Sequence, residues 1–108
     1  MRVLFDQGTP VPIARFLSAH SVRTTLQEGW DRFSNGDLLR VAEAAGFDVL
    51  LTTDNSLAYQ QNLKDRKLAI IVLSRNRWRL VQRMIPEVVA AVDSAAPGCY
   101  IVVTIPIL

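Results

Sequence analysis

The chain of 108 residues contains one cysteine, Cys99, and one histidine, His20. A single cysteine excludes an internal disulfide framework and a cysteine-based zinc cage, and it makes a cytoplasmic location the expectation. A single histidine leaves little room for histidine-based metal ligation or a histidine-containing catalytic triad. The chemistry of this protein is therefore expected to come from carboxylates, hydroxyls and arginines.

Long hydrophobic runs are also lacking. The longest, Leu68–Leu73, is far too short to span a bilayer, and residues 2–6 lack the features of a signal peptide. Apolar residues make up 50% of the chain and charged residues 20%, which is typical of a globular domain with its own core. We therefore predict a single domain over residues 1–108 that does not enter a membrane.

Positive and negative charges are unevenly distributed along the chain. Residues 64–83 hold seven basic residues and one acidic residue, a net charge of +6, although the whole chain carries only +2. The remaining residues therefore sum to −4. Such segregation indicates an anionic partner for the basic segment rather than a particular fold.

Short apolar or β-branched runs predict the strands of a sheet. There are five of them: Val3–Phe5, Ser21–Thr24, Phe47–Thr52, Leu68–Leu73 and Tyr100–Ile105. The third and fourth runs are apolar without alternation, which is typical of strands that are covered on both faces.

Helical patterns lie between these runs. Thr9 followed by Pro10 predicts an N-cap with proline at the first helical position, in a helix that ends near Ala19. The sequence Ser34-Asn35-Gly36-Asp37 predicts the start of a second helix, which Gly46 ends.

Two further helical patterns follow the third and fourth strands. A short helix is predicted over 56–62, and a longer apolar stripe runs from Trp78 to Val92. Pro86 interrupts this stripe and predicts a kink or two helices. The alternation of strands and helices predicts an α/β fold, a three-layer α/β/α domain with a mostly parallel five-stranded sheet. In the usual strand order the first strand lies beside the third.

Acidic residues follow the strands at the points where they end. Asp6 comes directly after the first strand, Glu28 comes after the second, and Asp54 follows the third. Asp37 begins the helix that returns to the third strand, so it is expected at the same edge of the sheet. His20 precedes the second strand and is expected at the opposite edge. The topology therefore predicts an acidic cluster at the carboxyl edge, beside the switch point.

Clustered carboxylates repel one another, and their pKa values rise unless a cation lies between them. Mg²⁺ prefers oxygen ligands and needs only one or two carboxylates, and it can activate a water for attack on a phosphate. We therefore predict a site for Mg²⁺ or Mn²⁺ formed by Asp6, Asp37 and Asp54, with Glu28 as a weak supporting residue. Each aspartate also has a structural interpretation: Asp37 closes a capping box, Asp54 caps the following helix, and Asp6 orders the turn at Gly8.

These residues resemble the PIN-domain nucleases, a superfamily that includes the VapC-type toxins. The likeness rests on Asp6 after the first strand, on Asp37 opening the segment 37–47, and on Leu51-Thr52-Thr53-Asp54. The chain is similar to small PIN-like prokaryotic proteins, and the resemblance covers nearly all of it. The glutamate that the family carries between its first and third acids has no clear counterpart here.

The resemblance implies a PIN-like fold and a metal-dependent ribonuclease that hydrolyses single-stranded RNA. Asp6, Asp37 and Asp54 would be its catalytic metal ligands, and Thr52 would support the last of them. The resemblance also implies the toxin of a toxin–antitoxin pair, with a small antitoxin protein as partner.

The basic segment fits an RNA substrate. Arg75 and Arg77 follow the fourth strand, so they are expected at the acidic edge, where arginines can hold phosphates in bidentate fashion. Trp78 can either stack on a base or pack in the core.

A non-catalytic interaction module is the alternative. In this interpretation the PIN-like fold binds a protein partner or forms a homodimer, and the acids only cap helices and turns. The apolar C-terminal segment Ile101–Leu108 favours association, because an apolar edge strand needs a partner or a cover. Pro106 is typical of an edge strand.

Overall fold

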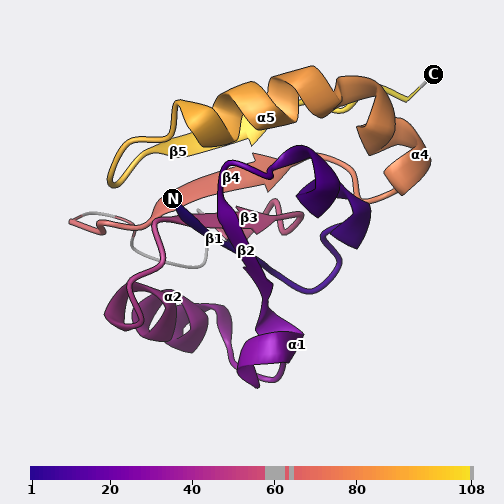
Figure 1. Ribbon diagram of the computed structural model, residues 1–108. Helices are drawn as coiled ribbons and strands as arrows, with labels where there is room; N and C mark the ends of the chain where they lie inside the picture. Colours follow the sequence, from indigo (N-terminus) through magenta and orange to yellow (C-terminus); the bar gives the residue numbers. More distant parts are fainter. Residues whose placement is uncertain (58–62, 64, 108) are drawn as a thin grey trace.

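The computed structural model describes residues 1–57, 63 and 65–107, and it shows an α/β domain built on a five-stranded sheet (Figure 1). Its strands are β1 (Arg2–Phe5), β2 (Ser21–Thr24), β3 (Val49–Thr52), β4 (Ala69–Leu73) and β5 (Tyr100–Val103). Their order in the sheet is β2-β1-β3-β4-β5, and every pairing is parallel. The prediction of a parallel sheet with the first strand beside the third is therefore confirmed.

Helical segments cover both faces of this sheet. They are η1 (Val11–Phe16), α1 (Thr25–Glu28), α2 (Asn35–Ala44), α4 (Trp78–Val81), η2 (Gln82–Met84) and α5 (Ile85–Asp93). Figure 1 shows α5 on one side of the sheet and α2 on the other. The three-layer arrangement that the alternating pattern predicted is present.

Alternation along the central strands divides the apolar side chains between two cores. Val3 and Phe5 point into the core beneath η1, α4 and α5, while Leu4 points into the core beneath α2. Every residue of β3 and β4 is buried. Both faces of these strands are covered, which explains why their sequences are continuously apolar.

The segment after β1 differs from the prediction. It forms a 3₁₀ helix that begins at Val11, and Thr9 does not cap it. The buried Thr9 hydroxyl instead donates a hydrogen bond to the carbonyl oxygen of Leu51, 3.0 Å away. In this segment Ile13 and Leu17 are buried, whereas Phe16 is 44% exposed. A contact with a distant strand has replaced the local cap.

The later helix boundaries were predicted correctly. Ser34 is the N-cap of α2, and its side-chain oxygen accepts a hydrogen bond from the amide of Asp37. Gly46, with φ of +85°, follows the helix end in the left-handed region that favours glycine. The stripe after β4 is broken into α4, η2 and α5, and Pro86 lies in the first turn of α5.

Three further expectations concern the segment after β3, membrane-spanning helices and the last strand. The short helix predicted over 56–62 lies almost wholly outside the described part of the chain. Within residues 1–57, 63 and 65–107, no helix is long and apolar enough to cross a membrane. The last strand, β5, ends at Val103 rather than Ile105, and it forms one edge of the sheet.

Candidate functional site

The candidate site lies where β1 and β3 end side by side. Phe5 pairs with Leu51 in the sheet, and the amide of Asp6 donates to the Leu51 carbonyl oxygen at 3.1 Å. Asp6 and Asp54, here called the acid pair, therefore extend from neighbouring strands at their carboxyl ends. This is the switch point of the sheet, because β1 is followed along the chain by strands on both of its sides.

A buried hydroxyl joins the two aspartates. Thr52, the last residue of β3, is fully buried. Its Oγ1 donates a hydrogen bond to Asp6 Oδ2 at 2.9 Å and accepts one from the backbone amide of Asp54 at 3.1 Å. One hydroxyl thus fixes the carboxylate of one aspartate and the backbone of the other.

Asp54 is held by donors from two elements. Its Oδ1 accepts hydrogen bonds from the amide of Ser56 at 2.9 Å and from the Ser56 hydroxyl at 2.6 Å. Its Oδ2 accepts one from the side-chain amide of Asn35, the first residue of α2, at 2.8 Å. Hydrogen bonds from Ser56 and then Asn35 hold the pKa of Asp54 below its ordinary value, against the opposing effect of burial. Asp54 is therefore ionised at neutral pH.

Asp6 has the opposite electrostatic environment. Burial is the largest cause that raises its pKa, and the charge of Asp54 raises it further. Hydrogen bonds from Thr52 and from the amide of Gln7, which lies 2.7 Å from Asp6 Oδ1, act against this rise. The environments of the acid pair therefore push the two pKa values apart, a pattern that is typical of functional carboxylates.

Asp37 is not brought into contact with the acid pair. Its carboxylate forms an ion pair with Arg40, one turn along the exposed side of α2. Hydrogen bonds from Arg40 and then Ser34 lower the pKa of Asp37. Across the part of the chain that the structure describes, no three acidic, histidine or cysteine side chains are grouped closely enough to hold a metal ion. The place of Asp37 in a three-acid site stays a prediction.

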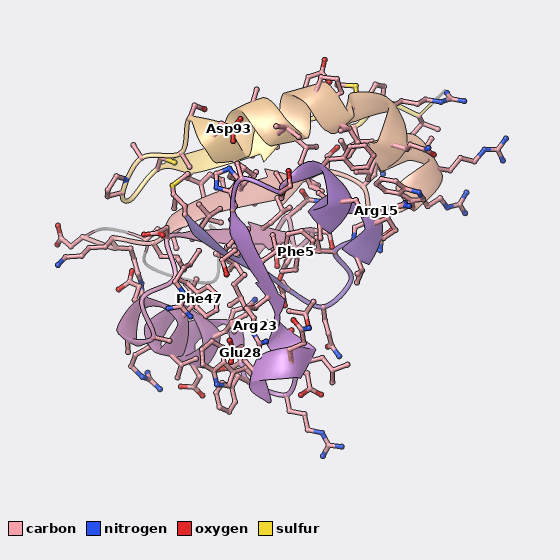
Figure 2. All side chains as sticks on the ribbon, in the orientation of Figure 1. Phe5, Arg15, Arg23, Glu28, Phe47 and Asp93 are labelled. Atoms are coloured by element: carbon pink, nitrogen blue, oxygen red, sulfur yellow. The ribbon has the colours of Figure 1, made fainter. Side chains whose placement is uncertain are left out.

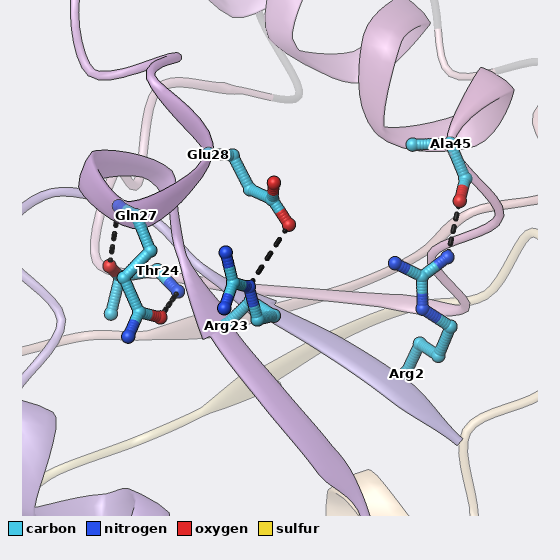
Figure 3. Close-up of polar contacts among 6 residues, drawn as sticks. All are labelled: Arg2, Arg23, Thr24, Gln27, Glu28 and Ala45. Atoms are coloured by element: carbon cyan, nitrogen blue, oxygen red, sulfur yellow. Dashed lines mark hydrogen bonds and ion pairs between the residues drawn. The ribbon is translucent and has the colours of Figure 1, made fainter.

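Glu28 has a partner of its own. Figure 3 shows its carboxylate beside Arg23 of β2, with Oε1 3.2 Å from Nε. The same figure shows the capping box of α1, in which the Thr24 hydroxyl accepts from the amide of Gln27 while the Gln27 side chain accepts from the amide of Thr24. Glu28, the last residue of α1, therefore has a structural role, because its ion pair joins this short helix to β2.

The loop after β4 reaches the same edge. The side-chain amide of Asn55, directly after Asp54, lies 3.5 Å from the carbonyl oxygen of Ser74. The Ser74 hydroxyl accepts a hydrogen bond from the amide of Ile105 at 2.7 Å. Arg75 and Arg77 follow in this loop, and both are exposed. The predicted RNA-binding arginines therefore lie in the loop that adjoins the acid pair.

Other residues singled out in the sequence lie elsewhere. His20 is at the opposite edge, as predicted, with Nε2 2.6 Å from Oδ1 of Asp93 and Nδ1 3.2 Å from the amino group of Met1. Figure 2 labels Asp93, which lies on α5. Trp78 packs against the core beneath α5 and lies 6.2 Å from Phe16 between ring centroids. The core role of Trp78 is therefore the one that the structure supports.

The hydrogen bonds from Ser56 agree with the structural interpretation in which Asp54 caps the segment that follows it. Sequence reasoning missed the donor Asn35, since its contact with Asp54 joins residues 19 positions apart and depends on how α2 returns to the sheet.

Comparisons with protein-family models, with curated proteins and with solved structures found no match to this chain. The class that the structure defines is a three-layer α/β domain with an all-parallel sheet and a pair of carboxylates at its switch point.

Proposed function

We propose that this protein is a metal-dependent ribonuclease that hydrolyses single-stranded RNA at the acid pair. The observation that carries the proposal is the contact of Asp6 with Thr52, which holds the half-buried carboxylate of Asp6 next to the start of the Asp54 loop at the carboxyl edge of a parallel sheet. The PIN-like family, the role as a toxin and a small antitoxin partner are the parts of the proposal that rest on the sequence resemblance alone.

The donor set of the acid pair fits Mg²⁺ or Mn²⁺. Carboxylate oxygens have about four lone-pair sites per group. Asp54 Oδ1 accepts two hydrogen bonds from Ser56, so Oδ2 and the two oxygens of Asp6, with one hydrogen bond each, retain capacity for a cation. Two carboxylates are enough for Mg²⁺, which keeps several waters. When bound, the ion would supply a water of lowered pKa and charge to stabilise the displaced phosphate.

The chain itself would orient these groups. The Thr52 hydroxyl would hold the Asp6 carboxylate, while Asn35 and Ser56 would hold the Asp54 carboxylate in its ionised form. Positive charge near Asp6 would oppose the rise in its pKa that burial and Asp54 cause. Arg75 and Arg77 would contact the phosphates of the substrate from the adjoining loop.

Cleavage of a labelled single-stranded RNA tests this function. We expect cleavage with Mg²⁺ or Mn²⁺ and none in EDTA, and we expect Asp54→Asn to lose most of the rate while remaining folded. Asp37→Asn is the informative variant for the three-acid hypothesis, because a two-acid site predicts a much smaller loss for it. Glu28→Gln is the control, since Glu28 pairs with Arg23. Wild-type cleavage by Asp54→Asn would remove the acid pair from the mechanism.

The interaction module remains a second candidate because of the edge strand β5. Val102 is 52% exposed on this strand, and an apolar edge is a template for pairing with another chain. A second copy of the protein could add its own β5 there and form a homodimer without using the acid pair.

A further inference from the structure

Arginines gather on the surface of α4 beyond the loop that holds Arg75 and Arg77. Two adjoining cavities of about 250 and 300 Å³ share Arg77, Leu80 and Ile107 in their walls. Arg75 completes one cavity, and Arg79 and Arg83 complete the other. We call this surface, formed by the four arginines with Leu80 and Ile107, the arginine cleft.

No acidic residue that the structure describes neutralises the charges of the arginine cleft. None of these residues forms an ion pair with any of the four guanidinium groups, and none of those that line the two cavities is acidic. Three arginines outside the cleft do have such partners: Arg23 pairs with Glu28, Arg40 with Asp37 and Arg66 with Glu43. A surface that keeps several unpaired guanidinium groups together is suited to an external anion with several charges.

The position of the cleft favours a nucleic-acid strand as that anion. The Asn55–Ser74 contact joins the loop of Asp54 to the loop that leads into the cleft. The four arginines follow along the chain in this loop, on α4 and on η2, and they line the two adjoining cavities. A backbone with one phosphate per nucleotide can contact several such groups, and each guanidinium can bind a phosphate in bidentate fashion.

Apolar side chains at the cleft support the same partner. Ile107 is 67% exposed, and it lines both cavities together with Leu80. These residues can contact the sugars of a strand whose phosphates the arginines hold. Within the described part of the chain no aromatic side chain lines the cleft, so binding there is expected to depend on the backbone charge and little on the bases.

We propose that Arg79 and Arg83 anchor the phosphate backbone of a single strand outside the acid pair, so that the protein binds extended strands regardless of their base sequence. The inference rests on the proposed function for the choice of a nucleic-acid strand as the anion and for its direction toward Asp6 and Asp54.

Binding of a fluorescein-labelled oligouridylate, measured by anisotropy in EDTA over a salt series, tests the anchor without cleavage. Removal of one arginine–phosphate interaction should reduce the log–log salt slope by roughly 0.7. The double variant R79A/R83A should therefore reduce the slope by about 1.4 and bind more weakly at low salt. An oligoadenylate of the same length should give a similar slope.

The double variant R66A/K67A is the matched control, because it removes the same charge from the opposite end of β4. An equal effect of the two double variants would mean that only net charge matters and would overturn the anchor. Competition by polyglutamate as strong as that by the oligonucleotide, at equal charge, would overturn it in favour of an acidic protein partner. Intact binding without any cleavage in Mn²⁺ would refute the ribonuclease and leave the anchor standing.

Discussion

At the scale of single residues, the hydroxyl of Thr52 contacts both aspartates of the acid pair. It donates to the Asp6 carboxylate and accepts from the Asp54 amide, inside a fully buried environment. Removing it leaves a backbone amide without its partner and takes from Asp6 the hydrogen bond that most opposes the rise in its pKa. Position 52 therefore controls both the stability and the electrostatics of the site.

Thr52→Val should lower the free energy of unfolding by about 1–3 kcal/mol at neutral pH, the usual cost of leaving a buried polar group unpaired. Because the pKa of Asp6 is raised in the folded state, its ionisation destabilises the fold as pH rises through that pKa. Loss of the hydroxyl raises this pKa further, so the destabilisation by Thr52→Val should be smallest below roughly pH 4 and should grow toward neutral pH.

Urea unfolding at several pH values measures this effect. Thr52→Ser is the matched control, because it keeps the hydroxyl and loses only a methyl group. Its destabilisation should not vary with pH. A loss for Thr52→Val that is the same at all pH values would show that the hydroxyl does not act on Asp6.

Asp54 should affect stability in the opposite direction from Asp6. Its pKa is held low by Ser56 and Asn35, so its charge stabilises the folded state above the unfolded pKa, and this stabilisation is lost as pH falls. Without metal, Asp54→Asn should therefore lower the melting midpoint at neutral pH. Mutual repulsion of clustered carboxylates, which the sequence predicted, affects mainly Asp6.

Mn²⁺ should raise the melting midpoint of the wild type and not that of Asp54→Asn. An ion that binds only the folded state stabilises it by about 2.7 kcal/mol at a hundred times Kd, and each kcal/mol corresponds to roughly 4–8 °C for a domain of this size. Differential scanning fluorimetry gives the shift, with Glu28→Gln as a control that keeps the response. An equal shift in Asp54→Asn would place the cation elsewhere.

At the scale of elements, the parts that local sequence signals specify were predicted well. The start of α2 follows from the cap Ser34, its end from Gly46, and the break before α5 from Pro86. These signals act through hydrogen bonds and torsion angles within a few residues, so a sequence shows them directly.

Contacts between distant elements account for what the sequence did not show. Thr9 donates to β3 instead of capping η1, and Asn35, the first residue of α2, donates to Asp54. Asp37 also has a contact that its sequence position did not show, an ion pair with Arg40 on α2 itself. The convergence of Asp6 and Asp54 was predictable because strand order alone places both at one edge.

Ser34→Ala should destabilise the protein by about 0.5–2 kcal/mol, the usual cost of removing an N-cap side chain. The loss should also loosen the first turn of α2, which carries Asn35 to Asp54. We therefore expect weaker Mn²⁺ binding in addition to lower stability, measured by calorimetric titration of the folded variant. Ser18→Ala, at an exposed position before β2, is the control. An unchanged Mn²⁺ affinity would show that the Ser34 cap does not affect metal binding at the acid pair.

At the scale of the whole molecule, the arginine cleft and the exposed edge strand β5 offer two different surfaces for binding. The arginine cleft follows the carboxyl end of β4, while β5 presents Val102 along the neighbouring edge of the sheet. Binding of a nucleic-acid strand and self-association would therefore use separate surfaces, so a substitution can abolish one of these interactions without the other.

Val102→Lys should abolish any homodimer, because a charge on an edge strand opposes pairing with another edge. Sedimentation equilibrium at high micromolar concentration should give a dimer for the wild type and a monomer for this variant. Thr104→Lys, exposed just beyond the strand, is the control. A wild-type monomer at all concentrations would remove the homodimer from consideration.

The all-parallel sheet also has a consequence for how the chain folds during synthesis. Val3 of β1 pairs with Val22 and with Val49, and every neighbouring pair of strands needs a crossover connection because parallel strands cannot be joined by a hairpin. β1 leaves the ribosome first but can complete its pairing only after β3 has emerged. Folding should therefore be slow for a chain of this length, and nascent chains that stop before β3 should remain sensitive to protease.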